Sequence, residues 1–443
     1  MIELLDRKGR CFLNKTFIER DSIHNVNLHV LPTDRFKTYA ITAYIGYPLA
    51  EDSVTQTALI PFVLRRGNAR YPETIKFRER LDDLYGAGFG FDIVKRGNYQ
   101  MIQFRMDMIE DQYVDDRGLL QDALTFMGDT LTRPYVSDDS FHHAYVEAEK
   151  ETLRKRIEAV INDKIRYAAE RCIAEMCEDE PYRLHPLGQL NDIDAIDGKS
   201  LYHHYVNWLE NASIDLYVVG NTTLDEVRPL IQDAFKIEGN KGNRYETTPF
   251  QSKRKDIKTV VEQLDITQGK LNLGLGTPIN YAHPNYAAAL MYNGILGAFP
   301  HSKMFINVRE KASLAYYAAS RLDGHKGILT IQSGIEIEHY EQAVSIIKEQ
   351  LAAMREGQIT ELEMTQTKAM LSNQLREIQD SAFDMSEFDF NQCFAGIERN
   401  AESLLAEVQG VTVKQIQEVA QTVKLDLIYF LRDREGGEKD ATN

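Results

Sequence analysis

Two segments of the chain resemble each other at a constant spacing, and this internal repeat limits the folds that the chain can adopt. Arg78 and Tyr85 stand seven residues apart, between an expected helix and an expected strand. Arg309 and Tyr316 show the same separation in the same kind of setting, and both are shifted by 231 positions (309 − 78 and 316 − 85). Such a period indicates a duplicated domain. We therefore predict two similar halves that face each other and enclose a chamber.

The length of the chain agrees with two structural units, because 443 residues exceed what one hydrophobic core ordinarily organises. Alternating apolar residues predict strands at 23–31, 39–45, 91–94, 100–106 and 214–219. Helical patterns and stop signals predict helices at 51–66 and 73–85 and a long charged helical segment at about 140–176. The fold class we predict is α+β, with a mostly antiparallel sheet in each half and helices packed on one face.

A polar stretch divides the two halves. Residues 236–255 (KIEGNKGNRYETTPFQSKRK) contain Gly, Asn and Pro without any periodicity, which is typical of a linker. We expect an N-terminal domain at residues 1–237, a linker at 238–256 and a C-terminal domain at 257–443.

Charge and hydropathy exclude several classes of function. The chain has 51 Lys and Arg against 67 Asp and Glu, and its net charge of −16 repels nucleic acid and anionic membranes. No stretch approaches the roughly 20 apolar residues that span a bilayer. The N-terminus lacks the basic start and apolar run of a secretory signal, and four cysteines in this length do not form a disulfide scaffold. We expect a cytoplasmic protein with reduced cysteines.

Common catalytic motifs are missing from the sequence. It contains no P-loop, no dinucleotide-binding glycine fingerprint and no nucleophile elbow. The adjacent pairs His142/His143 and His203/His204 cannot easily close on one metal ion, because neighbours on a helix point about 100° apart. Other histidines that could supply ligand atoms are His185, His301 and His325. A metallopeptidase that uses these histidines is the least favoured of the functions considered.

The run Leu296–Ser320 (LGAFPHSKMFINVREKASLAYYAAS) resembles the C-terminal signature of the pitrilysin/insulinase zinc metallopeptidases, which include mitochondrial processing peptidase. Further segments match family landmarks in the same order: Leu64–Pro72 (LRRGNARYP), His185–Gly188 (HPLG) and Val218–Asn221 (VVGN). The resemblance covers about residues 20–430. It is nearest to the YmfF-like subgroup of bacterial proteins, which are non-catalytic and pair with a homologue that carries the zinc motif.

The resemblance also implies where the zinc motif should stand, and there the sequence departs from the family. Active members carry His-x-x-Glu-His before the glycine turn, and the matching positions here are Ala58, Pro61 and Phe62. None of these side chains binds zinc or activates water. The third ligand, a Glu in the long helix, matches Arg156, or Lys155 after a one-residue slip, and an outer-shell Glu matches Glu149. We therefore expect no metal, no cofactor and no catalytic residue on this chain alone.

Pro61 implies a further change, because proline inside a helix removes a backbone hydrogen bond at a cost of about 3 kcal/mol. We expect the helix around Pro61 to be shortened or bent. The other half of the machinery is present: the resemblance implies that Arg309 and Tyr316 reach substrate near the zinc, Arg309 by donating to a peptide carbonyl and Tyr316 by stabilising an oxyanion. The alternative is that Arg309 forms a surface ion pair while Tyr316 packs in the core. Tyr317 is the adjacent competitor for the role of Tyr316.

Two functions remain open. The first is a non-catalytic, substrate-binding subunit of a heteromeric peptidase, which supplies Arg309 and Tyr316 to a heterodimer with a zinc-motif homologue. Peptidase activity would then appear only in the presence of that partner. The second is a peptide-binding scaffold without any proteolytic role. Loss of partner-dependent turnover on Arg309→Ala or Tyr316→Phe would separate the first from the second.

Overall fold

A computed structural model describes residues 17–115, 118–237 and 245–434. The N-terminal half is built on a six-stranded sheet in the order β1-β2-β8-β3-β5-β4. Only β2 and β8 pair in parallel, and every other neighbouring pair in this sheet is antiparallel. The strands are β1 (Glu19–Ile23), β2 (Val26–Pro32), β3 (Thr38–Pro48), β4 (Gly88–Arg96), β5 (Tyr99–Ile109) and β8 (Ser213–Gly220). A separate two-stranded ribbon pairs β6 (Val136–Ser137) with β7 (Ser140–Phe141).

The C-terminal half repeats this arrangement. Its five-stranded sheet has the order β11-β12-β10-β13-β9, and again only one neighbouring pair, β9 with β13, is parallel. The strands are β9 (Lys258–Gln263), β10 (Gly269–Gly276), β11 (Ala315–Asp323), β12 (Ile328–Ile335) and β13 (Lys424–Arg432). This order matches β4-β5-β3-β8-β2 of the first sheet strand for strand, so the predicted duplication and the α+β class are confirmed.

The two Arg and Tyr pairs that suggested the repeat are not equivalent in the structure. β4 begins at Gly88 and β11 begins at Ala315, a shift of 227 positions rather than 231. As a result Tyr85 lies in the turn before β4, with a φ of 58°, whereas Tyr316 lies within β11. The duplication is therefore correct, but the spacing of seven residues in both halves is a coincidence.

The helices of each half, with one exception in each, pack on one face of the sheet of that half. In the first half they are α1 (Val54–Leu64), α2 (Thr74–Asp83), α3 (Leu119–Thr132), α4 (His143–Asn162), α5 (Lys164–Met176), α6 (Gly198–Asn211) and α7 (Leu224–Ala234). In the second half they are α8 (Tyr286–Asn293), α9 (Tyr340–Arg355), α10 (Glu361–Glu377), α11 (Ala382–Phe394), α12 (Ala401–Gly410) and α13 (Val413–Thr422). Two π-helical turns, Gly294–Ala298 and Phe305–Lys311, follow α8.

One prediction about local structure was wrong, and another was displaced at its start. The expected strand 23–31 is β2, which begins only at Val26, because β1 ends at Ile23 and His24 turns the chain with a φ of 51°. The expected long helix is interrupted at Asp163, whose side chain accepts hydrogen bonds from the amides of Ile165 and Arg166 and so caps a new helix, α5. Because of this break, α5 can pack on the sheet of the second half.

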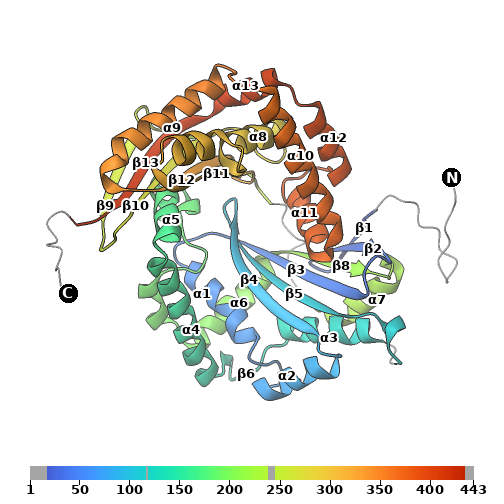
Figure 1. Cartoon of the computed structure of the whole chain (residues 1–443). Helices are drawn as coiled ribbons and strands as arrows, with labels where there is room; N and C mark the ends of the chain where they lie inside the picture. Colours follow the sequence, from blue (N-terminus) through green and yellow to red (C-terminus); the bar gives the residue numbers. More distant parts are fainter. Residues whose placement is uncertain (1–16, 116–117, 238–244, 435–443) are drawn as a thin grey trace, which may run out of the picture.

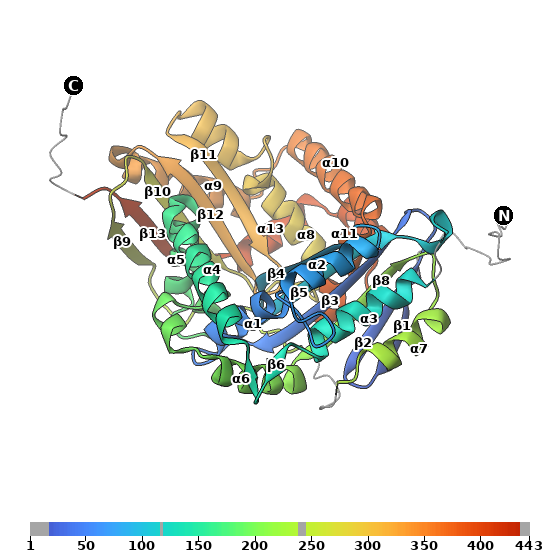
Figure 2. The same ribbon diagram turned by 90° about the horizontal axis from the view of Figure 1, so that it is seen from below.

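The two halves exchange one helix each (Figures 1 and 2). Helix α5 packs on β10 and β13 of the second sheet, and α11 packs on β3 and β8 of the first. Residues Tyr44, Met101 and Tyr217 contact Phe390 and Phe394 of α11, on the sheet face opposite to the one that the half's own helices cover. Each sheet is thus covered on its second face by a helix from the other half.

The contact between α5 and the second sheet is close. A Cβ on Gly274 of β10 would lie only 2.7 Å from the sulfur of Met176, so glycine is needed at this position for α5 to approach. Cys172, Met176 and Cys177 form a buried cluster with Leu427 and other residues of β13. Burial raises the pKa of Cys172 above its usual range and that of Cys177 to about 12, which agrees with the expected reduced, packing cysteines.

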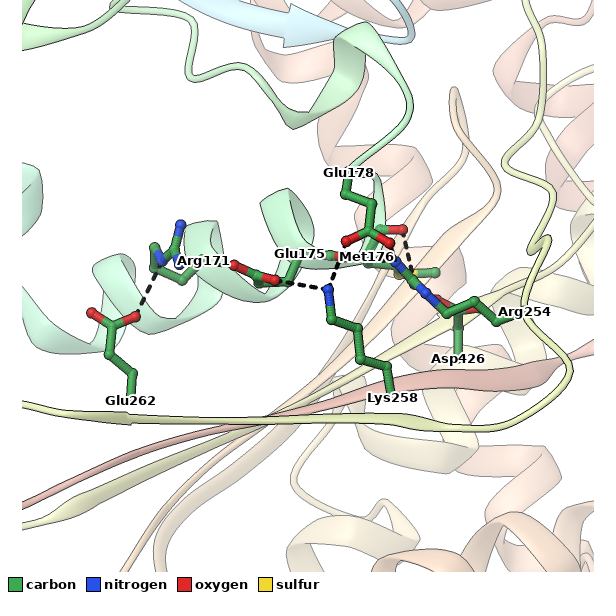
Figure 3. Close-up of polar contacts among 8 residues, drawn as sticks. All are labelled: Arg171, Glu175, Met176, Glu178, Arg254, Lys258, Glu262 and Asp426. Atoms are coloured by element: carbon green, nitrogen blue, oxygen red, sulfur yellow. Dashed lines mark hydrogen bonds and ion pairs between the residues drawn. The ribbon is translucent and has the colours of Figure 1, made fainter.

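Ion pairs fix the end of α5 to the second half (Figure 3). Arg254 donates to the buried carboxylate of Asp426 at 2.6 Å and to Glu178 at 2.6 Å. Lys258 of β9 pairs with Glu175 at 2.9 Å and with Glu178 at 2.7 Å. The bonds from Lys258 and Arg254 lower the pKa of Glu178 to about 2, so this carboxylate stays charged at neutral pH.

The boundaries 1–237, 238–256 and 257–443 stay a prediction, as does the chamber between the halves. Residues 238–244 of the expected linker lie outside the described residues. Of the rest of that segment, 245–256 contains neither helix nor strand, and Tyr245 stacks on Phe394 of α11 with ring centroids 4.5 Å apart. The described part of this segment is therefore packed against the protein.

Candidate functional site

Helix α1 carries the three positions matched to the first part of the zinc motif. Ala58, Pro61 and Phe62 are all buried in it. Pro61 does not break the helix, which continues to Leu64 and ends three residues after the proline, two residues earlier than predicted. An alanine methyl, a pyrrolidine ring and a phenyl ring offer no lone pair to a metal, so the side chains present here do not fit zinc.

Arg156 of α4 faces the same position from the neighbouring helix. Its guanidinium carbon lies 4.7 Å from the centroid of the Phe62 ring and 5.7 Å from that of Phe91 in β4. Phe62 and Phe91 meet edge to face, with centroids 4.8 Å apart. Arg156, rather than the neighbouring Lys155, is thus the residue that contacts Phe62. That Ala58, Pro61, Phe62 and Arg156 correspond to the zinc-motif positions stays a prediction.

Glu149 lies two helical turns before Arg156 in α4. Its side chain is 4% exposed and pairs with Arg66, which follows α1, through one carboxylate oxygen. The second oxygen, Oε2, is buried and has no hydrogen-bond partner. Glu149 borders a cavity of about 280 Å³ whose polar wall also includes Arg65, Arg66 and Arg78. The expected outer-shell carboxylate is therefore bound to an arginine.

Arg309 lies in the second π-helical turn, Phe305–Lys311. Segments of π-helix are rare and often occur at functional sites. Arg309 is exposed, and its guanidinium carbon lies 4.6 Å from the ring centroid of Phe305. Within the part of the chain that the structure describes, no carboxylate lies within ion-pair distance of Arg309. The alternative of a surface ion pair for Arg309 is thus not seen in the described residues.

Tyr316 occupies a β-bulge in β11. The register of β11 with β12 shifts between Ala315 and Tyr317, which leaves Tyr316 as the extra residue. A bulge re-aims the side chain that it carries and is common beside active sites. The Tyr316 side chain is 61% exposed, and its hydroxyl donates to Glu336 at 2.6 Å. This hydrogen bond and the charge of Glu336 raise the pKa of Tyr316, so the hydroxyl keeps its proton at neutral pH.

Tyr317 is half-buried. A Cβ on Gly334 of β12 would lie 2.4 Å from its ring, and burial raises the pKa of Tyr317 to about 12. Tyr316 is therefore the exposed tyrosine of the pair, and the alternative that it packs in the core is wrong. The π-helical turn carries Arg309 and the bulge carries Tyr316, the two residues that the sequence analysis predicted to reach substrate.

The remaining histidines are spread over the molecule. His204 bonds Thr57 at 2.7 Å, His301 bonds Thr367 at 2.8 Å and His325 bonds Asn391 at 3.0 Å. Burial lowers the pKa of each, and also that of His185, so all four favour the neutral form. No metal-binding group of described residues includes any of the histidines named from the sequence.

One cluster with metal-ligand chemistry was missed from the sequence. His29, Asp389 and Cys393 place ligand atoms within 4.8 Å of one another. The guanidinium of Arg20 already occupies this place, at 2.7 Å from Asp389 and 2.5 Å from Nδ1 of His29. The other ring nitrogen of His29 is bonded to Asp215 at 2.9 Å. Because all ligand nitrogens are engaged, this cluster joins β1, β2, β8 and α11 and does not fit a metal ion.

No described helix combines the length and the apolar character that crossing a membrane requires. The duplicated sheets, the exchanged helices and the apolar side chains at Ala58, Pro61 and Phe62 define a two-domain, peptidase-like α+β protein. The model of the "Peptidase M16 inactive domain" family matches residues 195–371.

The chain is 41% identical over 409 residues to the "Probable inactive metalloprotease YmfF" of Bacillus subtilis (strain 168), covering 92% of this chain and 96% of that protein. It is 22% identical over 298 residues to the "Uncharacterized zinc protease YmxG" of the same strain, covering 65% of this chain and 70% of that protein. The crystal structure of a conserved protein from Enterococcus faecalis V583 superimposes with a TM-score of 0.88 at 32% identity, covering 94% of this chain and 99% of that one. The chain belongs to the M16 peptidase family, among its inactive metalloprotease homologues.

Proposed function

We propose that this protein is the non-catalytic, substrate-binding subunit of a heteromeric M16 peptidase. One observation carries the proposal: Tyr316 is turned into solvent by a β-bulge, while the positions matched to the zinc motif are filled by buried apolar side chains and Arg156. A protein that had lost all peptidase function would have no need to keep an exposed tyrosine on an irregular strand. Single exposed apolar groups are common, so it is the bulge that makes Tyr316 informative.

The chemistry of the two side chains fits substrate positioning. Arg309 keeps its N–H donors free for peptide carbonyls, because the face of its guanidinium stacks on Phe305. Tyr316 keeps its proton and can donate to an oxyanion. Its present acceptor, Glu336, fixes the orientation of the ring before substrate arrives. A substrate oxygen would replace Glu336 as the acceptor of this hydrogen bond.

The partner in this proposal is a homologue with an intact zinc motif, and it supplies both the metal and the general base. This chain contributes no cofactor. The heterodimer would act on a peptide substrate in the cytoplasm. The zinc protease YmxG of Bacillus subtilis has a sequence similar to this chain and is the kind of protein that the proposal requires.

The test is reconstitution. The purified chain, a purified zinc-motif homologue and their equimolar mixture are assayed against a quenched fluorescent peptide library, with complex formation followed by analytical ultracentrifugation. We expect cleavage by the mixture well above the sum of the separate proteins. Elemental analysis of the chain alone should find no stoichiometric zinc. A mixture that forms no complex and gains no activity would reject the proposal.

A peptide-binding scaffold is the alternative function. It has the same exposed Arg309 and Tyr316, but they would hold a peptide without helping to cleave it. Tyr316→Phe separates the two functions, since a subunit of a peptidase loses turnover while a scaffold keeps its affinity for peptide. Both measurements are made on the same preparation.

A further inference from the structure

Four arginines converge where the ends of α1 and α2 meet α4. Arg65 and Arg66 follow α1, Arg78 lies in α2 and Arg156 lies in α4. The first three line the cavity of about 280 Å³ beside Glu149. Burial lowers the pKa of Arg65, and the charges of Arg156, Arg66 and Arg78 lower it further, whereas that of Glu149 raises it. In a chain with a net charge of −16, this concentration of positive charge is unusual.

The positive charge of this group is largely uncompensated. Arg66 pairs with Glu149. Among the residues that the structure describes, no carboxylate lies within ion-pair distance of Arg65, Arg78 or Arg156. Like charges that lie close together repel each other, and an anion that binds among them relieves this repulsion. Arg65, Arg78 and Arg156 are exposed, so an anion from solvent can reach them.

Arg65 and Arg156 each lie over an aromatic ring. Arg65 lies 5.4 Å from the centroid of the Phe91 ring, and Arg156 lies 5.7 Å from the same ring. A cation–π contact uses the face of a guanidinium and leaves its N–H groups free to bond an oxyanion, often in a bidentate manner. Stacking on Phe91 thus holds Arg65 and Arg156 in position, as the ion pair with Glu149 holds Arg66.

The other walls of the cavity limit the class of ligand. Phe77, Leu81 and Phe89 form an apolar side that suits an aliphatic or peptide stem rather than a free ion. Glu149 also borders the cavity, but its unpartnered oxygen Oε2 is buried and is not offered to a ligand. The ligand should therefore bring an oxyanion and an apolar stem.

We propose that this pocket, beside the end of α1, binds the carboxylate of an acidic side chain in a peptide. The class of ligand rests on the proposed peptide-binding function, whereas the site itself rests on the arginines and the cavity. It differs from the site at Arg309 and Tyr316 and gives the chain a preference for acidic peptides despite its negative net charge. Binding should weaken as salt screens the arginines.

The experiment measures fluorescence anisotropy of the full chain with a labelled peptide containing two glutamates, with its glutamine counterpart, and with inorganic phosphate as competitor. The variant Arg65→Gln/Arg78→Gln removes two charges from the pocket. The matched control Lys348→Gln/Arg376→Gln removes two exposed cations from α9 and α10. Thermal unfolding checks each variant, and Arg78→Gln alone, on the exposed face of α2, replaces the double variant if that does not fold.

We expect the glutamate peptide to bind at least tenfold more tightly than the glutamine peptide. The pocket variant should lose affinity by about tenfold for each arginine, the size of one charge-assisted hydrogen bond, while the control should bind as the wild type does. Equal binding of the two peptides, or equal losses in both variants, would overturn the proposal. Binding of inorganic phosphate without binding of the glutamate peptide would overturn the assignment to peptide carboxylates. Since no partner is present, these outcomes are independent of whether reconstitution yields cleavage.

Discussion

The guanidinium carbon of Arg156 lies 4.7 Å from the ring centroid of Phe62, so two positions matched to zinc ligands contact each other across α4 and α1. In a zinc site, the side chains at these two positions would bind the same ion. Here one side chain supplies a cation and the other a ring face, and a cation–π contact joins the two helices instead. The contact between Phe62 and Arg156 thus stabilises the first half at positions matched to zinc ligands.

This contact predicts a measurable coupling between Phe62 and Arg156. A double-mutant cycle with Phe62→Leu and Arg156→Gln should give a coupling of about 0.5–1 kcal/mol in the free energy of unfolding, measured with urea. Phe62→Leu alone should cost more than Arg156→Gln, because Phe62 is 1% exposed and also packs on Phe91. If the two substitutions change the free energy of unfolding additively, Phe62 and Arg156 do not interact.

Tyr316→Phe should separate function from stability. Because the side chain is 61% exposed, loss of its hydroxyl should change the free energy of unfolding by no more than about 0.5 kcal/mol. Partner-dependent kcat should fall by about 10²–10³-fold, the usual effect of removing an oxyanion donor. The matched control is Tyr317→Phe, whose ring packs against Gly334 and should leave kcat near the wild-type value. If both variants have the same kcat, Tyr316 has no role in turnover.

Patterns along the chain predicted most strands of the first sheet and several helices of the first half, but not where they pack. The alternation in 39–45 and the helical spacing in 73–85 depend on burial of one face, which a sequence shows directly. The exchange of α5 and α11 was not predicted, because an apolar face does not say which sheet will cover it. The break at Asp163 was missed because Asp163 stands among many charged residues. The sequence alone does not show that its side chain caps a new helix.

For the candidate site, too, the sequence identified residues but not how they are arranged in space. Arg309 and Tyr316 were found through a family signature, yet the bulge that exposes Tyr316 depends on the register with β12, which is a long-range property. The arginine pocket joins residues from α2 and α4 with the segment after α1, and Arg78 and Glu149 are separated by 71 positions (149 − 78). No local pattern connects such residues, so only the fold could bring them together.

The exchanged helices predict that neither half is stable alone. A fragment of residues 17–237 lacks α11 and would expose Tyr44, Met101 and Tyr217, which are otherwise buried. A fragment of residues 245–434 would likewise lose the cover that α5 gives to its sheet. We expect each fragment to be largely insoluble when expressed by itself, and the two to form a soluble complex when coexpressed. A soluble, cooperatively unfolding single fragment would contradict this expectation.

The Arg254–Asp426 pair should be the most sensitive ion pair of the α5 junction. The Asp426 side chain is 1% exposed, so removal of its partner leaves a buried charge without compensation. Arg254→Gln should lower the free energy of unfolding by about 3 kcal/mol, near the lower end of what a broken buried pair costs. The control Lys253→Gln removes an exposed cation beside it, at 3.6 Å from Asp179, and should cost less than about 1 kcal/mol.

His325 should make the protein less stable in mild acid. Its ring lies between the halves, bonded to Asn391 of α11 and packed against Tyr281 and Phe394. Burial, with a smaller contribution from Arg96, lowers the pKa of His325 from 6.5 to about 4 against the opposing charge of Asp323. Above pH 6.5 the ring is neutral in both the folded and the unfolded chain, so it adds no dependence on pH.

Between pH 6.5 and about 4 the unfolded chain binds a proton at His325 that the folded chain excludes. The free energy of unfolding should therefore fall as the pH falls, by up to about 1.4 kcal/mol for each pH unit from this group. Urea unfolding at several pH values in this window measures the slope. His325→Gln should be less stable at every pH because it loses ring packing, but its slope should be shallower. The control His203→Gln replaces an exposed histidine and should keep the wild-type slope; equal slopes in all three proteins would show that His325 does not carry this effect.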